Sequence, residues 1–170
     1  MNNIIISAIG SDRSGIVLEL SSIITNHGGN VEESRMTRLG TDFAIIMLVS
    51  IKKNGYESLE VALQSIDGLT IITKPTSGKI NKGIQYQIDL SGADNEGIVN
   101  VLSKYLAKKT INILDMETYI SNAPVTGTPL FNLKAITEAR EDIELLDIQT
   151  DLNHISKKLG VEIVAFKLNK

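Results

Sequence analysis

The stretch GSDRSGIV, residues 10–17, returns 82 positions later as GADNEGIV, residues 92–99. Between residues 10 and 30 the same offset aligns eight identical pairs, and the pair that follows, Val31 and Ile113, is conservative. Identities at one fixed spacing indicate an internal duplication. The identical pairs are Gly10 and Gly92, Asp12 and Asp94, Gly15 and Gly97, Ile16 and Ile98, Val17 and Val99, Leu20 and Leu102, Ser21 and Ser103, and Asn30 and Asn112.

Each copy predicts the same order of secondary structure. Apolar residues alternate in the predicted strands and recur every three to four residues in the predicted helices. The order is β-α-β-β-α-β twice, which predicts an α+β fold of two tandem ferredoxin-like units with antiparallel sheets. Right-handed crossovers place both helices of a unit on one face of its sheet. The predicted strands are 3–10, 30–39, 42–51, 69–73, 84–91, 112–120, 129–136 and 161–168, and the apolar stripes of the predicted helices begin at Ile16, Leu59, Ile98 and Ile148.

A short polar segment separates the two copies. KPTSGKINKG (74–83) has the composition of an exposed linker, and we expect a first domain at 1–75, a linker at 76–83 and a second domain at 84–170. Residues 43–49 are apolar at every position, so this strand presents apolar side chains on both faces. Such a sheet needs a cover on its second face or a neighbour at its edge. We therefore predict that the two copies, or two chains in a homo-oligomer, associate through these strands.

The composition narrows the class of protein. The chain has 170 residues and a net charge of −3, without the basic surplus that direct nucleic-acid binding requires. The absence of cysteine excludes disulfides, thiolate metal sites and a cysteine nucleophile. Two isolated histidines make no recognisable metal site. No apolar run is long enough to span a membrane, and the start of the chain does not resemble a signal peptide. We predict a cytoplasmic protein without a metal, a cofactor or a catalytic site.

The repeated turn lies where a predicted strand ends and a predicted helix begins. Asp12 and Asp94 fit either of two roles there: a cap for the first free backbone N–H groups, or the ammonium-binding carboxylate of a small-ligand niche. Gly15 and Gly97 each cost up to ~1 kcal/mol relative to alanine in a first helical turn. Their presence in both copies predicts that a ligand or a neighbouring strand approaches closely.

The same residues carry a family resemblance. GSDRSGIV after a first strand, followed by GGNVEESRMTRLG (28–40), resembles the ACT domain, a small regulatory module that typically senses amino acids. The tandem layout and APVTGTPLFNLKA (123–135) resemble the glycine cleavage system transcriptional repressor family. The resemblance implies a regulator without catalysis that binds an amino acid, with glycine the first candidate, and a transcriptional activator protein. ACT ligands generally bind where the strand–helix loop of one domain meets a strand of its partner, which implies ligand-binding roles for Asp12, Arg13, Ser14, Gly15, Ile16, Asn30, Asp94, Gly97, Ile98 and Asn112.

Two other functions fit parts of the sequence. One is a detached amino-acid-sensing regulatory subunit of a metabolic enzyme, and the other is an acylphosphatase-type hydrolase in which Arg13 grips phosphate. The second copy has Asn95 and Glu96 where the first has Arg13 and Ser14, which disfavours the hydrolase and weakens anion binding in the second turn. The insertion SNAPVTGTP (121–129) is either a tolerated surface loop or an arm that contacts a partner.

Overall fold

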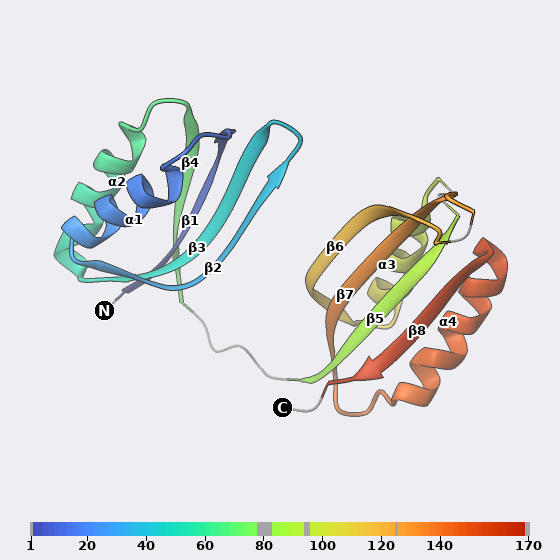
Figure 1. The fold of residues 1–170 in the computed structure, drawn as a ribbon. Helices are drawn as coiled ribbons and strands as arrows, with labels where there is room; N and C mark the ends of the chain where they lie inside the picture. Colours follow the sequence, from blue (N-terminus) through green and yellow to red (C-terminus); the bar gives the residue numbers. More distant parts are fainter. Residues whose placement is uncertain (1, 78–82, 94–95, 125, 169–170) are drawn as a thin grey trace. The chain divides into compact units, whose positions relative to one another are not determined.

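The computed structural model describes residues 2–77, 83–93, 96–124 and 126–168. The chain divides into two compact units, Met1–Lys79 and Ile80–Lys170. Each unit has a four-stranded antiparallel sheet with its two longer helices on one face (Figure 1). The predicted fold class, two tandem ferredoxin-like β-α-β-β-α-β units, is confirmed.

The first unit has the strand order β2-β3-β1-β4. Strand β1 lies in the middle of the sheet and pairs antiparallel with both β3 and β4, while β2 pairs with β3 at the edge. The elements are β1 (Asn2–Ser11), α1 (Ile16–Asn26), β2 (Gly29–Leu39), β3 (Asp42–Ile51), a short 3-10 helix η1 (Lys53–Gly55), α2 (Tyr56–Gln64) and β4 (Leu69–Thr76).

The second unit repeats this arrangement with the order β6-β7-β5-β8. A break in the strand register, after Val31 in β2 and after Ile113 in β6, falls at equivalent places in the two units. The duplication is therefore preserved in this irregularity of the backbone as well as in the sequence. The elements are β5 (Ile84–Ala93), α3 (Ile98–Lys108), β6 (Asn112–Asn122), β7 (Pro129–Ala139), α4 (Leu145–Leu159) and β8 (Val161–Lys167).

Each unit buries its own hydrophobic core between sheet and helices. In β1 the alternating residues Ile4, Ile6 and Ala8 are buried, because successive strand side chains point to opposite faces and only one face meets the helices. Leu20 of α1 and Leu102 of α3 occupy equivalent places in the two cores and are fully buried. Among the described residues, no helix is both long and apolar enough to cross a membrane.

Two segments differ from what their composition predicts. Strand β4 includes Lys74–Thr76, which the composition assigned to the linker, and Pro75 lies opposite Ile4. Proline is tolerated there because β4 is an edge strand. Most of the predicted linker, residues 78–82, lies outside the described residues. In the second hairpin β6 and β7 pair as far as Asn122 and Pro129, so the predicted insertion shortens to a connection in which the Ala123 N–H donates to the Thr128 carbonyl (2.8 Å).

Candidate functional site

The loop between β1 and α1 is held against the β2–β3 hairpin. Gly10 lies opposite Phe43 in the sheet, and Ser11 lies opposite Asp42. The backbone N–H of Asp12 then donates to the carbonyl of Thr41 at 2.9 Å. These contacts fix where the loop leaves the sheet and where α1 begins.

Gly15 and Gly97 are required by backbone conformation. They are the N-cap residues of α1 and α3, with φ of 91° and 83° in the left-handed region. A Cβ built on either glycine meets no described atom within 4 Å. Contrary to the predicted close approach, no neighbouring strand among the described residues comes near either glycine, and the space beside both is open within that part of the chain.

The close approach occurs instead at the first glycine of each repeated motif. A Cβ on Gly10 would lie 2.0 Å from the carbonyl oxygen of Gly68, and one on Gly92 would lie 2.6 Å from Cγ1 of Val161. Both glycines let the central strand pass its neighbour at the end of the sheet. The sequence shows that Gly10 and Gly92 are identical in the two copies. The same is true of Gly15 and Gly97, so the repeat alone does not show which of the two glycines is crowded.

Asp12 does not cap the helix. Within the described residues no side chain caps α1, and the Asp12 carboxylate instead lies 3.5 Å from the Arg38 guanidinium of β2. Arg13 forms an ion pair with Glu19, one turn into α1. The first backbone N–H groups of α1 are therefore left without a side-chain acceptor, beside the open space at Gly15. An anion is favoured at such a helix N-terminus.

Arg38 is a residue of this site that the sequence did not identify. Arg38 lies near the end of β2, and its guanidinium reaches Asp12 in the loop after β1. It can do so because it lies opposite Phe43, which in turn lies opposite Gly10. Arg38 and the loop after β1 become neighbours only because β3 lies between β2 and β1 in the sheet.

Ile16 and Ile98 contribute to the turns through their backbones. Each is the first residue of its helix, and each side chain is 2% exposed and belongs to the core of its unit. Their N–H groups stand at the helix N-termini, while their side chains anchor those helices on the sheet. Ser14, in contrast, is exposed in the loop.

Asn30 and Asn112 lie at the far end of the sheets from these turns. Asn30 lies opposite Ser50, at the level of Asn3 in β1, which is seven residues before Gly10. At roughly 3.3 Å per residue this separation is about 23 Å. Asn112 lies opposite Glu138, which pairs with Gln85 at the start of β5. Within one unit the structure brings together Asp12, Arg13, Ser14, Gly15 and Ile16, and it does not bring Asn30 to them.

A local hydrogen-bond network surrounds Asn30. Its amide donates to Glu32 at 3.1 Å, and the Ser50 hydroxyl donates to the same carboxylate oxygen at 2.5 Å. The Ser50 hydrogen bond, followed by that of Asn30, lowers the pKa of Glu32 below its ordinary value of 4.5. The carboxylate is thus held charged at the start of β2.

Removing the Ser50 hydroxyl is expected to raise the pKa of Glu32 toward 4.5. Because the folded-state pKa is the lower one, the network stabilises the fold above that ordinary value, and the contribution is lost as the pH falls through the folded pKa. A carboxyl-carbon NMR titration of Ser50→Ala measures the change. Ser7→Ala, a substitution in β1 that removes no hydrogen bond to Glu32, is the control; an unchanged Glu32 titration in Ser50→Ala would contradict the assignment.

In the second turn Gly97 keeps the left-handed N-cap conformation, but the described residues around it differ from those around Gly15. Asp94 and Asn95 lie outside the described residues, and Glu96 is exposed. The position equivalent to Arg38 is Ile120, which also lies opposite the phenylalanine next to the crowded glycine. The position equivalent to Glu19 is Val101. The two turns therefore offer an anion the same helix N-terminus in different electrostatic settings.

Neither histidine of the chain belongs to these turns. Nδ1 of His27, the C-cap residue of α1, lies 2.7 Å from the Ile23 carbonyl, and Nδ1 of His154 lies 2.9 Å from the Thr150 carbonyl. Each ring N–H donates to its own helix. In the part of the chain that the structure describes, no three histidine, aspartate or glutamate side chains are placed to hold a metal ion.

Comparison with known proteins relates this geometry to a family. A family model described as the ACT domain matches residues 2–71, which lie in the first unit. A UPF0237 protein of Methanococcus maripaludis is 34% identical over 68 residues, which make up 39% of this chain and 76% of that protein. The glycine cleavage system transcriptional repressor of Escherichia coli is 28% identical over 121 residues, covering 66% of this chain and 62% of the repressor.

A solved structure matches both units together. The crystal structure of an unknown protein from Galdieria sulphuraria is 34% identical, with a TM-score of 0.88, and the match covers 99% of each chain. Both units are thus matched in one other protein, including the second unit, to which the family model does not extend.

Proposed function

This chain belongs to the ACT-domain family, and from that premise we propose that it is an amino-acid-responsive regulator without catalytic activity, acting through contact with another protein. The observation that carries the proposal is the β1–α1 turn. Gly15 there leaves the N-terminus of α1 open, with the Asp12 carboxylate at the same loop. The similarity to the glycine cleavage system repressor makes glycine the first candidate ligand and a transcriptional activator the first candidate partner.

The turn offers complementary groups to the two charges of an amino acid. The backbone N–H groups at the start of α1 suit the ligand carboxylate. Asp12 suits the ammonium, because its contact with Arg38 is long, 3.5 Å, and its side chain is 37% exposed. A ligand that approaches Asp12 therefore displaces one weak ion pair rather than a buried one.

The resemblance to the ACT domain assigns Asn30 to the ligand site, and this assignment requires a second unit. It lies about 23 Å from Gly10 along the sheet of its own unit, so it reaches a β1–α1 turn only if that turn belongs to another unit. We propose that a second copy supplies it.

The net charge of −3 favours regulation through a bound activator protein over direct contact with DNA.

The test is thermal unfolding of the chain in the presence of each of the twenty amino acids at ~10 mM. A ligand at 100 times its dissociation constant stabilises the native state by about 2.7 kcal/mol, and we expect glycine to give the largest rise in midpoint. Asp12→Ala is expected to abolish that rise. Glu57→Ala, which removes a carboxylate on α2 of the same unit, is expected to keep it. Unchanged midpoints for the whole panel, or an equal rise in Asp12→Ala, would overturn the proposed ligand site.

A further inference from the structure

The sheet of the second unit has a polar and aromatic surface on the face away from its helices. Strand pairing sets three rows across β8, β5, β7 and β6. In β5, β7 and β8 the side chains of these rows alternate with buried core residues, which places them on the open face, and the β6 residues pair with β7 residues of that face. The rows are Glu162, Ser91, Asn132 and Tyr119; Val164, Asp89, Lys134 and Glu117; and Phe166, Gln87, Ile136 and Asp115.

The equivalent face of the first unit has a different chemistry. When the two units are aligned on Gly10 and Gly92, the equivalent rows are Thr70, Ile9, Ala44 and Thr37; Ile72, Ser7, Ile46 and Arg35; and Lys74, Ile5, Leu48 and Glu33. The central positions of the first unit, Ile9 and Ile46, are thus Ser91 and Lys134 in the second. The duplicated fold is the same, so the backbone does not demand the polar set.

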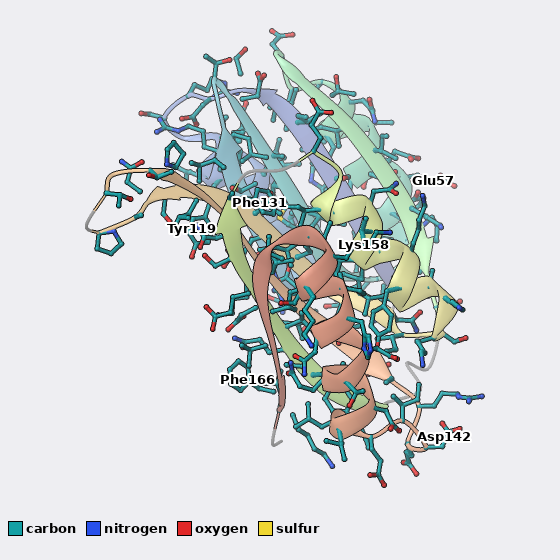
Figure 2. The ribbon with its side chains drawn as sticks, turned by 90° about the vertical axis from the view of Figure 1, so that its right-hand side faces the viewer. Glu57, Tyr119, Phe131, Asp142, Lys158 and Phe166 are labelled. Carbon is teal, nitrogen blue, oxygen red and sulfur yellow. The ribbon has the colours of Figure 1, made fainter. Side chains whose placement is uncertain are left out.

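The polar face is hollowed. A groove of about 430 Å³ lies on this face, and its lining includes the charged residues Glu162, Asp89 and Lys134 and the apolar or aromatic residues Tyr119, Val164 and Phe166. The two aromatic rings remain about half exposed, at 55% for Tyr119 and 47% for Phe166. Both labelled rings lie on the side of the sheet away from α4 (Figure 2). The volume is within the range of small-ligand pockets.

Hydrogen bonds hold the groove in shape and leave its outer charges available. The Gln87 amide donates to both oxygens of Asp89 at 2.9 Å, and the Ser91 hydroxyl donates to Asn132 at 3.0 Å. Neither Lys134 nor Glu162 forms an ion pair with another described residue. The three rows together carry four carboxylates and one ammonium, an excess of negative charge beside exposed aromatic rings.

We propose that this face is a docking surface for an extended, basic segment of a partner protein, in which arginine alternates with apolar residues. Charge complementarity favours this occupant, because guanidinium groups pair with carboxylates and stack on aromatic rings. In an extended segment alternate side chains share one face, so its arginines turn together toward the groove, where they reach Glu162 and Asp89 and stack on Phe166. The proposal rests on the proposed function, since it names the surface through which the regulator holds its protein partner.

The experiment uses the full chain and the fluorescently labelled peptide Ac-RVRFRV-NH2. We expect saturable binding by fluorescence anisotropy, at least about tenfold tighter than that of Ac-EVEFEV-NH2. Glu162→Lys is expected to weaken binding about tenfold. Its matched control is Thr70→Lys, the same change at the equivalent position of the first unit, which is expected to leave binding unchanged.

A second variant separates a shaped surface from general attraction between opposite charges. Phe166→Ala keeps every charge and is expected to weaken binding about fivefold through the lost stacking. Equal affinity for the two peptides, equal loss in Glu162→Lys and Thr70→Lys, or no loss in Phe166→Ala would overturn the proposal. The amino-acid response of the thermal midpoint is measured separately and depends on Asp12, so failure of the docking surface is distinguishable from failure of the ligand site.

Discussion

Gly10→Ala is expected to destabilise the first unit by about 3 kcal/mol, because overpacking against backbone forces the strand to shift. The new methyl group would lie 2.0 Å from the carbonyl oxygen of Gly68, where β4 begins beside the end of β1. A flexible side chain could move aside, but a backbone carbonyl in a turn between α2 and β4 has little freedom. Urea unfolding followed by NMR signals from each unit measures the loss in the first unit alone.

Gly15→Ala is the matched control for that substitution. Its Cβ meets no described atom within 4 Å, so the only cost is a left-handed backbone conformation, about 1 kcal/mol for a residue other than glycine. A Gly15→Ala loss as large as that of Gly10→Ala would show that backbone conformation, and not crowding, governs both positions. The comparison therefore separates the two reasons for which the repeated motif contains glycine.

Ile16→Ala is expected to cost about 3 kcal/mol, within the range for truncating a fully buried aliphatic side chain. Ile16 is 2% exposed and packs in the core of the first unit, although its N–H lies at the candidate ligand site. Ile98→Ala is expected to have a similar effect in the second unit. Chemical denaturation, again resolved by unit, measures both changes.

Val17→Ala serves as the neighbouring control, since this side chain is 41% exposed and its truncation leaves a smaller cavity or none. We expect a loss below about 1 kcal/mol for it. If Ile16→Ala were as mild as Val17→Ala, the assignment of the Ile16 side chain to the core would be contradicted. A stabilising role is compatible with the proposed ligand site, because only the Ile16 backbone faces the ligand.

The order of the elements could be predicted from local pattern. Burial of one face gives a strand or a helix a characteristic spacing of apolar residues, and this spacing can be read from the sequence. Examples are the alternation in IQYQIDLS (84–91) and the helical stripe that begins at Ile16. The duplication strengthened the prediction, since two copies of one pattern give two independent readings of the same fold. The ends of elements were less certain, as β4 shows by extending to Thr76.

The composition of the candidate site could be predicted only in part. Asp12 and Gly15 are only three residues apart in the chain, so a motif of a few residues was enough to place them together. Arg38 joins them from another strand, and Asn30 is about 23 Å away although both lie on β2. Which end of a strand meets which loop follows from strand order and direction, which a local motif does not contain.

The amino-acid sequence by itself determined that this protein has two units of one fold, with a strand–turn–helix motif repeated in each, because periodicity and repetition are properties of neighbouring residues. Tertiary structure decided the roles within that motif. It made Gly10 the crowded glycine and Gly15 the left-handed one, paired Asp12 with Arg38, and set Glu162, Asp89 and Phe166 around one groove. The physical reason is that crowding, charge pairing and surface complementarity arise between residues distant in the chain, and only the packed sheet brings those residues into register.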